Sequence, residues 1–142
     1  MKCIAYRTKE NNLCILYPVL NRGLSLEEII AKDVRADIYH IMESESLPSE
    51  PIFSRAWELE GGVVKVNLEK AKEIWKDVWR HTREPILKKL DLEWMRALEI
   101  GDVAKTSEVF QKKKELRDVT NINLDSIFTP EDLKNFWPSC LS

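Results

Sequence analysis

The spacing of apolar positions changes from strand-like to helix-like near Asn67. Before that residue, three short β-prone runs cover Lys2–Arg7, Leu13–Tyr17 and Ile38–Met42, with a polar turn signal at 9–12. β-prone runs separated by such a turn indicate a hairpin, so the first two runs predict paired antiparallel strands. The third run predicts a further strand of the same small sheet.

A short helix is predicted between the second and third strands, over Leu24–Val34. Ser25 followed three residues later by Glu28 is the pattern of a capping box, in which each side chain bonds the other residue's backbone N–H. A second hairpin is predicted from Trp57–Glu60 and Val63–Val66, because the Gly-Gly pair between them favours a tight turn. The pattern of residues over Phe53–Leu59, which overlaps the start of that hairpin, fits a helical turn and an irregular strand equally well.

Two long helices running back on each other are predicted after Asn67, which is placed to cap the first one. Apolar residues then recur at steps of three and four, the period of a helix face. Gly101 suits the left-handed end of this helix, and Asp102 suits the start of the returning one. The predicted inner face consists of Ala71, Trp75, Val78, Trp79, Ile86, Leu90, Trp94 and Ala97 on the first helix, and Thr106, Val109, Phe110, Leu116 and Val119 on the second.

Pro85 interrupts the first of these helices. Proline removes one backbone donor and crowds the carbonyl four residues earlier, here that of His81, at a cost of about 3 kcal/mol in a helix interior. The sequence therefore predicts a kink or break near Arg83–Pro85.

The last part of the chain predicts a loop and one more short helix, over Pro130–Phe136. Thr129 is a suitable cap, proline suits the first helical position, and acidic residues follow near the positive end of the helix dipole. Trp137 is the best candidate for an exposed anchor, whereas Phe136 is expected to hold the tail against the rest of the protein.

Together these elements predict an α+β fold, with a small N-terminal antiparallel sheet and a long C-terminal helical hairpin. Residues 1–66 form the mixed β/α part, and residues 67–142 form the hairpin with its short C-terminal helix. A chain of 142 residues is of the commonest single-domain length, so we expect the two parts to pack as one compact domain.

Composition narrows the class of function. The chain is 44% hydrophobic and 32% charged, as folded proteins are, and its formal net charge is −2. A domain that binds nucleic acid mainly through its phosphates usually carries a clear net positive charge, so this composition argues against nucleic acid as a partner. No apolar run approaches the roughly 20 residues of a membrane span, and no signal-peptide pattern opens the chain. The odd number of cysteines, Cys3, Cys14 and Cys140, favours a reducing compartment.

No known arrangement of catalytic residues stands out. His40 and His81 lack Cys, Asp or Glu neighbours at metal-ligand spacing, and no phosphate-binding loop or nucleophile motif is present. The sequence therefore predicts no enzyme, no cofactor and no metal site. An enzyme that joins one of the histidines to carboxylates distant in the sequence is the remaining alternative.

Protein contacts are the function that the sequence favours. The basic run Lys112–Lys114 is broken up by acidic neighbours, and Glu108 lies four residues before Lys112, which favours an ion pair on a helix surface. Trp75 and Trp79 lie one turn apart and either cover the sheet or anchor an interface. The predicted interface residues are Trp94, Arg96, Lys112, Arg117 and Trp137.

Four segments resemble a family of small, uncharacterised phage and prophage tail-region proteins. The segments are Phe53–Leu59 (FSRAWEL), Leu90–Glu99 (LDLEWMRALE), Lys114–Thr120 (KELRDVT) and Thr129–Pro138 (TPEDLKNFWP), in the family's order. The chain departs from the family at Pro48–Ser54, where relatives often carry "P-x-DR" before "FR".

The resemblance implies a non-enzymatic virion or tail-assembly protein of a bacteriophage. Its partners would be other phage structural proteins or further copies of itself, in the virion or in the host cytoplasm during assembly. It supplies no catalytic residues. The alternative is a small phage protein that binds and inhibits a host factor or defence component.

Overall fold

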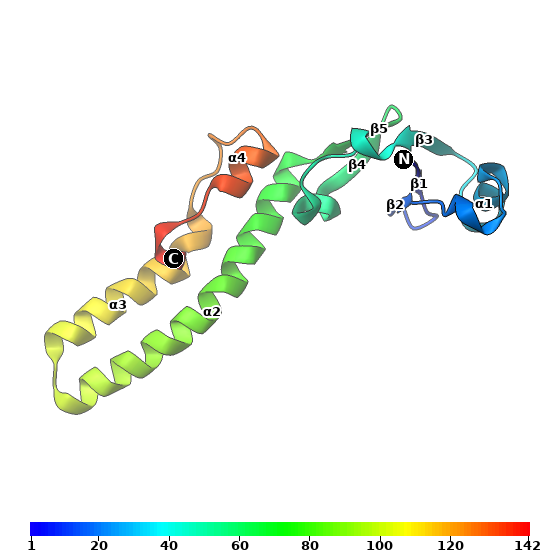
Figure 1. Cartoon of the computed structure of the whole chain (residues 1–142). Helices are drawn as coiled ribbons and strands as arrows, with labels where there is room; N and C mark the ends of the chain where they lie inside the picture. Colours follow the sequence, from blue (N-terminus) through cyan, green and yellow to red (C-terminus); the bar gives the residue numbers. More distant parts are fainter. The chain divides into compact units, whose positions relative to one another are not determined.

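The computed structural model describes residues 1–142, except for the side chain of Asn21. The predicted α+β class is confirmed, with small antiparallel sheets in the N-terminal part and long helices in the C-terminal part. The chain divides into two compact units, Met1–Asn67 and Leu68–Ser142, which Figure 1 draws from blue to red along the sequence. That the two units pack as one compact domain stays a prediction.

The N-terminal unit is built on a three-stranded antiparallel sheet. The central strand β1 (Lys2–Arg7) pairs with β2 (Leu13–Leu16) on one side and with β3 (Tyr39–Glu43) on the other. All four residues of Cys3–Tyr6 are buried in this central strand, which has a paired strand at each edge. The strands are those that the apolar runs predict, with ends that differ by one residue.

Helix α1 (Leu26–Asp33) lies between β2 and β3 in the sequence. The predicted capping box is present: the Glu28 N–H donates to Ser25 Oγ at 3.2 Å, and the Ser25 N–H donates to Glu28 Oε2 at 2.7 Å. The helix starts two residues later than the apolar pattern indicates. Ile29 is its buried contact with the rest of the unit.

The second hairpin has the predicted bounds, with β4 (Trp57–Glu60) and β5 (Val63–Val66) joined by two glycines. Gly61 and Gly62 have φ of +58° and +79°, values that residues with side chains rarely adopt. The ambiguous segment before the hairpin is a 3₁₀ helix, Pro51–Ala56, which buries Phe53 and Ala56.

The helical unit consists of α2 (Leu68–Ile100) and α3 (Val103–Arg117), which run antiparallel side by side (Figure 1). Both predicted end signals are confirmed. Gly101 has φ of +70°, and Asp102 Oδ1 accepts the Lys105 N–H at 3.0 Å. A left-handed glycine followed by a capping aspartate therefore turns the chain within two residues.

Of the predicted kink or break near Arg83–Pro85, the break is wrong, because α2 runs without interruption through Pro85. The pyrrolidine ring lies on the exposed side of the helix. Trp79 and Leu90, before and after the proline, are both buried against the rest of the unit. Burial of apolar side chains on both sides of the proline offsets the lost hydrogen bond, so the helix continues.

The assignment of Phe110 to the inner face of the return helix is also wrong. Val109, Leu116 and Val119 are buried as predicted, but Phe110 is 56% exposed. The inner row passes through Lys113, whose side chain is only 14% exposed. A helix turns by about 100° per residue, so Phe110 lies beside the inner row that Val109 occupies.

The C-terminal segment folds back onto α2 and α3 at the end of the hairpin away from Gly101 (Figure 1). It contains a 3₁₀ turn at Asp118–Asn121, helix α4 (Pro130–Asn135) and a final turn at Ser139–Leu141. Thr129 caps α4 as predicted, since its Oγ1 accepts the Asp132 N–H at 3.1 Å. The buried residues of this segment are Leu124, Ile127, Leu133 and Leu141.

Candidate protein-interaction surfaces

Two aromatic residues of the C-terminal segment are held against α2 and also face solvent. The Trp137 ring meets the edge of the Trp75 ring at 5.6 Å between centroids, and the Phe136 ring lies 5.9 Å from that of Trp79. Trp75 Nε1 donates to the Phe136 carbonyl at 2.9 Å. Phe136 and Trp137 nevertheless stay 37% and 39% exposed. We call these two residues the C-terminal aromatic pair.

A groove runs beside this pair. Its volume is about 540 Å³, and it lies between α3 and the segment from Phe136 to Cys140. The side chains that α3 contributes recur at helical spacing: Gln111, Lys114, Glu115 and Asp118. Burial raises the pKa of the Cys140 thiol, and the negative charge of Glu115 adds to the effect. The groove therefore offers aromatic, charged and neutral thiol groups along about two turns of helix.

Trp94, the first predicted interface residue, is engaged within the hairpin. Lys113 Nζ lies 5.5 Å from the centroid of the Trp94 ring and 2.5 Å from Asp91 Oδ1. The ammonium thus bridges α3 to a ring and a carboxylate on α2. Trp94 is half-buried, so one part of its ring supports the hairpin while another part remains accessible.

The bridge by Lys113 is expected to couple measurably to Asp91. A double-mutant cycle with Lys113→Met and Asp91→Asn should give a coupling free energy of about 1 kcal/mol, since the ammonium is nearly buried while the carboxylate faces solvent. Urea denaturation of the four proteins measures it. The pair Lys112→Met and Asp91→Asn is the control, because Lys112 bonds Glu108 instead. Equal coupling free energies in the two cycles would contradict a specific interaction between Lys113 and Asp91.

Lys112 is exposed and forms the predicted helix-surface pair. Its Nζ lies 3.0 Å from Glu108 Oε1, and Lys105 approaches the same carboxylate at 3.6 Å. The hydrogen bond from Lys112 lowers the pKa of Glu108, and the same bond raises the pKa of Lys112. Lys112 therefore presents a charge that its own helix partly neutralises.

The two arginines of the predicted interface lie far apart on the hairpin. Arg96 is exposed on the last turns of α2, near Gly101, whereas Arg117 is exposed at the opposite end of α3. The carbonyls of Arg117 and Leu116 accept hydrogen bonds from Arg83 Nη1 at 2.9 and 3.2 Å. A guanidinium from α2 thus caps the carboxyl end of α3. The five predicted residues do not form one site: Arg117 and Trp137 lie near the end of the hairpin away from Gly101, Trp94 and Arg96 lie nearer the turn, and Lys112 lies between them on α3.

The histidines lie in different units. His81 Nδ1 is 2.8 Å from the Asp77 carbonyl of its own helix. His40 lies over Gly62, at which an added Cβ would approach its Nδ1 to 3.2 Å. It lines a concavity of about 1300 Å³ together with Arg7, Arg35 and the two turn glycines. The described residues contain no group of three His, Cys, Asp or Glu side chains arranged to hold a metal ion.

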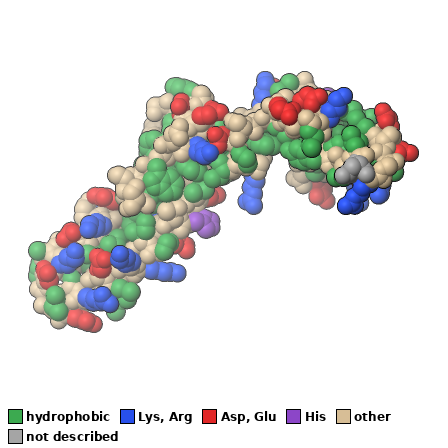
Figure 2. All heavy atoms as spheres, in the orientation of Figure 1, with side chains coloured by type: hydrophobic (Ala, Val, Ile, Leu, Met, Phe, Trp, Pro, Cys, Tyr) green, Lys and Arg blue, Asp and Glu red, His purple; other side chains and the backbone are tan. Residues whose placement is uncertain are grey.

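Sequence reasoning missed a set of exposed apolar side chains on the hairpin. Figure 2 shows hydrophobic side chains between charged ones across this surface. On the outer side of α2 and at the turn they are Leu92, Met95, Leu98, Ile100 and Val103. The signal was available, because these residues fall outside the stripe of the inner face. An apolar residue off the stripe is a candidate for contact with another molecule.

Comparison with protein-family models, curated proteins and solved structures found no match. Within the described residues, no helix combines the length and the apolar character needed to cross a membrane.

Proposed function

We propose that this chain is a non-enzymatic, phage-derived protein that works in the virion or in tail assembly through protein–protein contacts. Its partners are other phage structural proteins or further copies of itself. The C-terminal aromatic pair beside the α3 groove is the observation that supports this proposal. The phage origin rests on the resemblance of the four sequence segments.

The aromatic pair has the properties of an interface hot spot. Interface energy concentrates in a few residues, among which tryptophan is enriched, and these residues sit in well-packed surroundings. Trp75 Nε1 donates a hydrogen bond to the Phe136 carbonyl. The rings of Trp75 and Trp79 contact the partly exposed rings of Trp137 and Phe136, respectively. Because the rings are already ordered, binding a partner costs little further side-chain entropy.

The groove suits a helix or an extended segment of a partner. Lys114, Glu115 and Asp118 give it charges of both signs along α3. Such a pattern sets the direction of a bound segment more than it adds affinity. The aromatic pair then supplies most of the binding energy, and the charged residues select among partners.

The test is co-sedimentation of the tagged chain with phage particles and tail intermediates in cells that produce the phage. Trp137→Ala should weaken the association by about 30-fold, the equivalent of 2 kcal/mol for a hot-spot residue. Circular dichroism must show that the helical unit remains folded, because Trp137 also contacts Trp75.

Phe128→Ala is the matched control, since Phe128 is 78% exposed and does not line the groove. It should leave co-sedimentation unchanged. If the unmodified chain never sediments with particles or tail proteins, the proposal is overturned. Stoichiometric capture of a single host protein, in the absence of phage components, would favour the inhibitor alternative instead.

A further inference from the structure

The outer edge of β3 carries main-chain groups that no other strand uses. The Ser44 N–H donates to the Met1 carbonyl at 2.7 Å, which marks these residues as a hydrogen-bonded pair of the ladder between β1 and β3. Hydrogen-bonded and non-hydrogen-bonded pairs alternate in an antiparallel ladder. By the observed register, Met42 and His40 of β3 therefore bond to β1.

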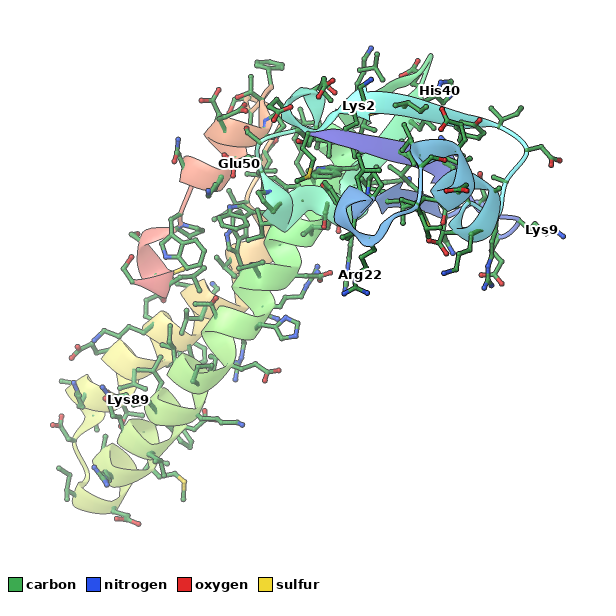
Figure 3. The ribbon with its side chains drawn as sticks, turned by 45° about the vertical axis from the view of Figure 1, so that its right-hand side comes forward. Lys2, Lys9, Arg22, His40, Glu50 and Lys89 are labelled. Atoms are coloured by element: carbon green, nitrogen blue, oxygen red, sulfur yellow. The ribbon has the colours of Figure 1, made fainter. Side chains whose placement is uncertain are left out.

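The intervening residues of β3, Tyr39, Ile41 and Glu43, direct their N–H and C=O groups away from β1. β3 is the last strand in the order β2-β1-β3, so no strand of the described chain pairs with these groups. The Glu43 carbonyl accepts one hydrogen bond from Ser46 Oγ at 2.7 Å and keeps a second lone pair. In Figure 3, Lys2 marks β1 and His40 marks β3, and the two strands run side by side.

This edge carries little of the usual protection against pairing, since Glu43 is the one carboxylate of β3 and the strand has no lysine or proline. Proteins blunt exposed strand edges with lysine, proline, a bulge or a covering element. β3 has the sequence YHIME and pairs with β1 without a bulge. β2 at the other edge is short, is followed by Pro18 and contacts β4. The two edges of the sheet are therefore not equivalent.

The side chains beside the free edge are apolar and exposed. Tyr39 and Ile41 point to the same face of the sheet and are 40% and 46% exposed, and the preceding Ile38 is 76% exposed. Successive residues of a strand alternate between faces, so the exposed side chains belong to the residues whose main-chain groups are free. Pairing with another strand would bury both these side chains and the free main-chain groups.

We propose that β3 pairs edge to edge and antiparallel with β3 of a second copy of this chain, about a two-fold axis at Ile41. In this register Ile41 lies opposite Ile41 of the second copy, and Tyr39 lies opposite the second copy's Glu43. The free N–H and C=O groups at Tyr39, Ile41 and Glu43 then all face matching groups. The two sheets become one continuous six-stranded sheet, with β3 at its centre.

The pattern of side chains favours a second copy in this register. Like charges directly opposite each other destabilise a strand pair. An axis at Glu43 would place two glutamates opposite each other, and an axis at Tyr39 would leave Ile41 and Glu43 without a partner residue in β3 of the second copy. The axis at Ile41 avoids both, and Lys2, which neighbours Glu43 on β1, offsets the charge of that carboxylate. Only the axis at Ile41 pairs the whole of β3 with itself, because Ile41 is the middle residue of Tyr39–Glu43.

Disulfide trapping tests the register directly. Hydrogen-bonded antiparallel residues have Cα atoms about 5.5 Å apart, within the range that a disulfide spans. In a background with Cys14→Ser and Cys140→Ser, Ile41→Cys should form a covalent dimer on mild oxidation. Tyr39→Cys alone should not, because its opposite residue is Glu43. A mixture of the Tyr39→Cys and Glu43→Cys proteins should cross-link.

A second measurement separates main-chain pairing from side-chain contact. Sedimentation equilibrium of the unmodified chain should show a dimer that dissociates on dilution. Ile41→Pro removes an N–H that β1 does not use, so the sheet is retained and the dimer should weaken at least about ten-fold. Ile41→Thr keeps the N–H and a β-branched side chain, and it should weaken the dimer much less.

The proposal is overturned by a chain that remains monomeric at every concentration. It is equally overturned by cross-linking that is as strong at Tyr39 as at Ile41, or by a dimer that Ile41→Pro leaves intact. The purified chain suffices for these measurements, so they are independent of the phage proteins on which the proposed function depends.

Discussion

Replacing Trp79 with alanine is expected to lower the free energy of unfolding of the helical unit by about 3–5 kcal/mol. Trp79 is fully buried on α2 and is the largest fully buried side chain of the protein. Its ring also supports Phe136 at 5.9 Å between centroids. Alanine would leave a cavity where α2 meets the C-terminal segment. Urea denaturation followed by the helical circular dichroism signal measures the loss.

Trp79→Phe should cost clearly less than Trp79→Ala. The indole Nε1 is buried without a hydrogen-bond partner among the described residues. Phenylalanine keeps a ring in the site and removes this unsatisfied donor, whose burial costs about 1–3 kcal/mol. Trp94→Ala should lower the free energy of unfolding by less than Trp79→Ala does, because the Trp94 ring is only half-buried. Equal destabilisation by Trp79→Phe and Trp79→Ala would show that shape rather than the unsatisfied donor decides this site.

Replacing Pro85 with alanine is expected to raise the free energy of unfolding by about 1–3 kcal/mol. Proline in a helix interior lacks the N–H that the His81 carbonyl would accept, and its ring crowds that carbonyl. Because the ring is exposed, its removal sacrifices little packing. The gain is less than the full helix penalty, since alanine also makes the unfolded chain more flexible. The same urea denaturation measures the difference.

Glu84→Ala is the matched control for this prediction, because Glu84 is the exposed neighbour of Pro85 on the same helix. Its effect should stay within about 0.5 kcal/mol, as for other surface substitutions. A Pro85→Ala protein less stable than the original would contradict the account. It would mean that the helical unit depends on the backbone geometry that proline imposes.

The elements that sequence reasoning located correctly depend on local chemistry. The capping box of Ser25 and Glu28 brings its partners within one helical turn. The Gly-Gly turn between β4 and β5 needs positive φ at both residues, and glycine is the residue that adopts it at least cost. Thr129 begins α4 in the same way, through an N–H three residues away. In each case the interacting atoms are near neighbours in the sequence, so their spacing was sufficient to predict the structure.

The candidate surface was predicted only in part. Trp137 is partly exposed, as the sequence predicted, whereas its role as an interface anchor stays a prediction. Its support by Trp75 and the groove along α3 could not be predicted, since Trp75 lies about 60 residues earlier. The role of Lys113 as a bridge to Asp91 and Trp94 was missed for the same reason.

By itself the sequence determined the class of the fold, the order of its elements and most of their ends, because caps, turns and apolar periods act over a few residues. Only the tertiary structure decided that α2 continues through Pro85, that Lys113 rather than Phe110 faces inward, and that β3 has a free edge. Each of these depends on contacts between residues far apart in the sequence. Burial across the helical hairpin outweighs a local helix penalty of about 3 kcal/mol, and pairing in the sheet leaves one strand without a neighbour.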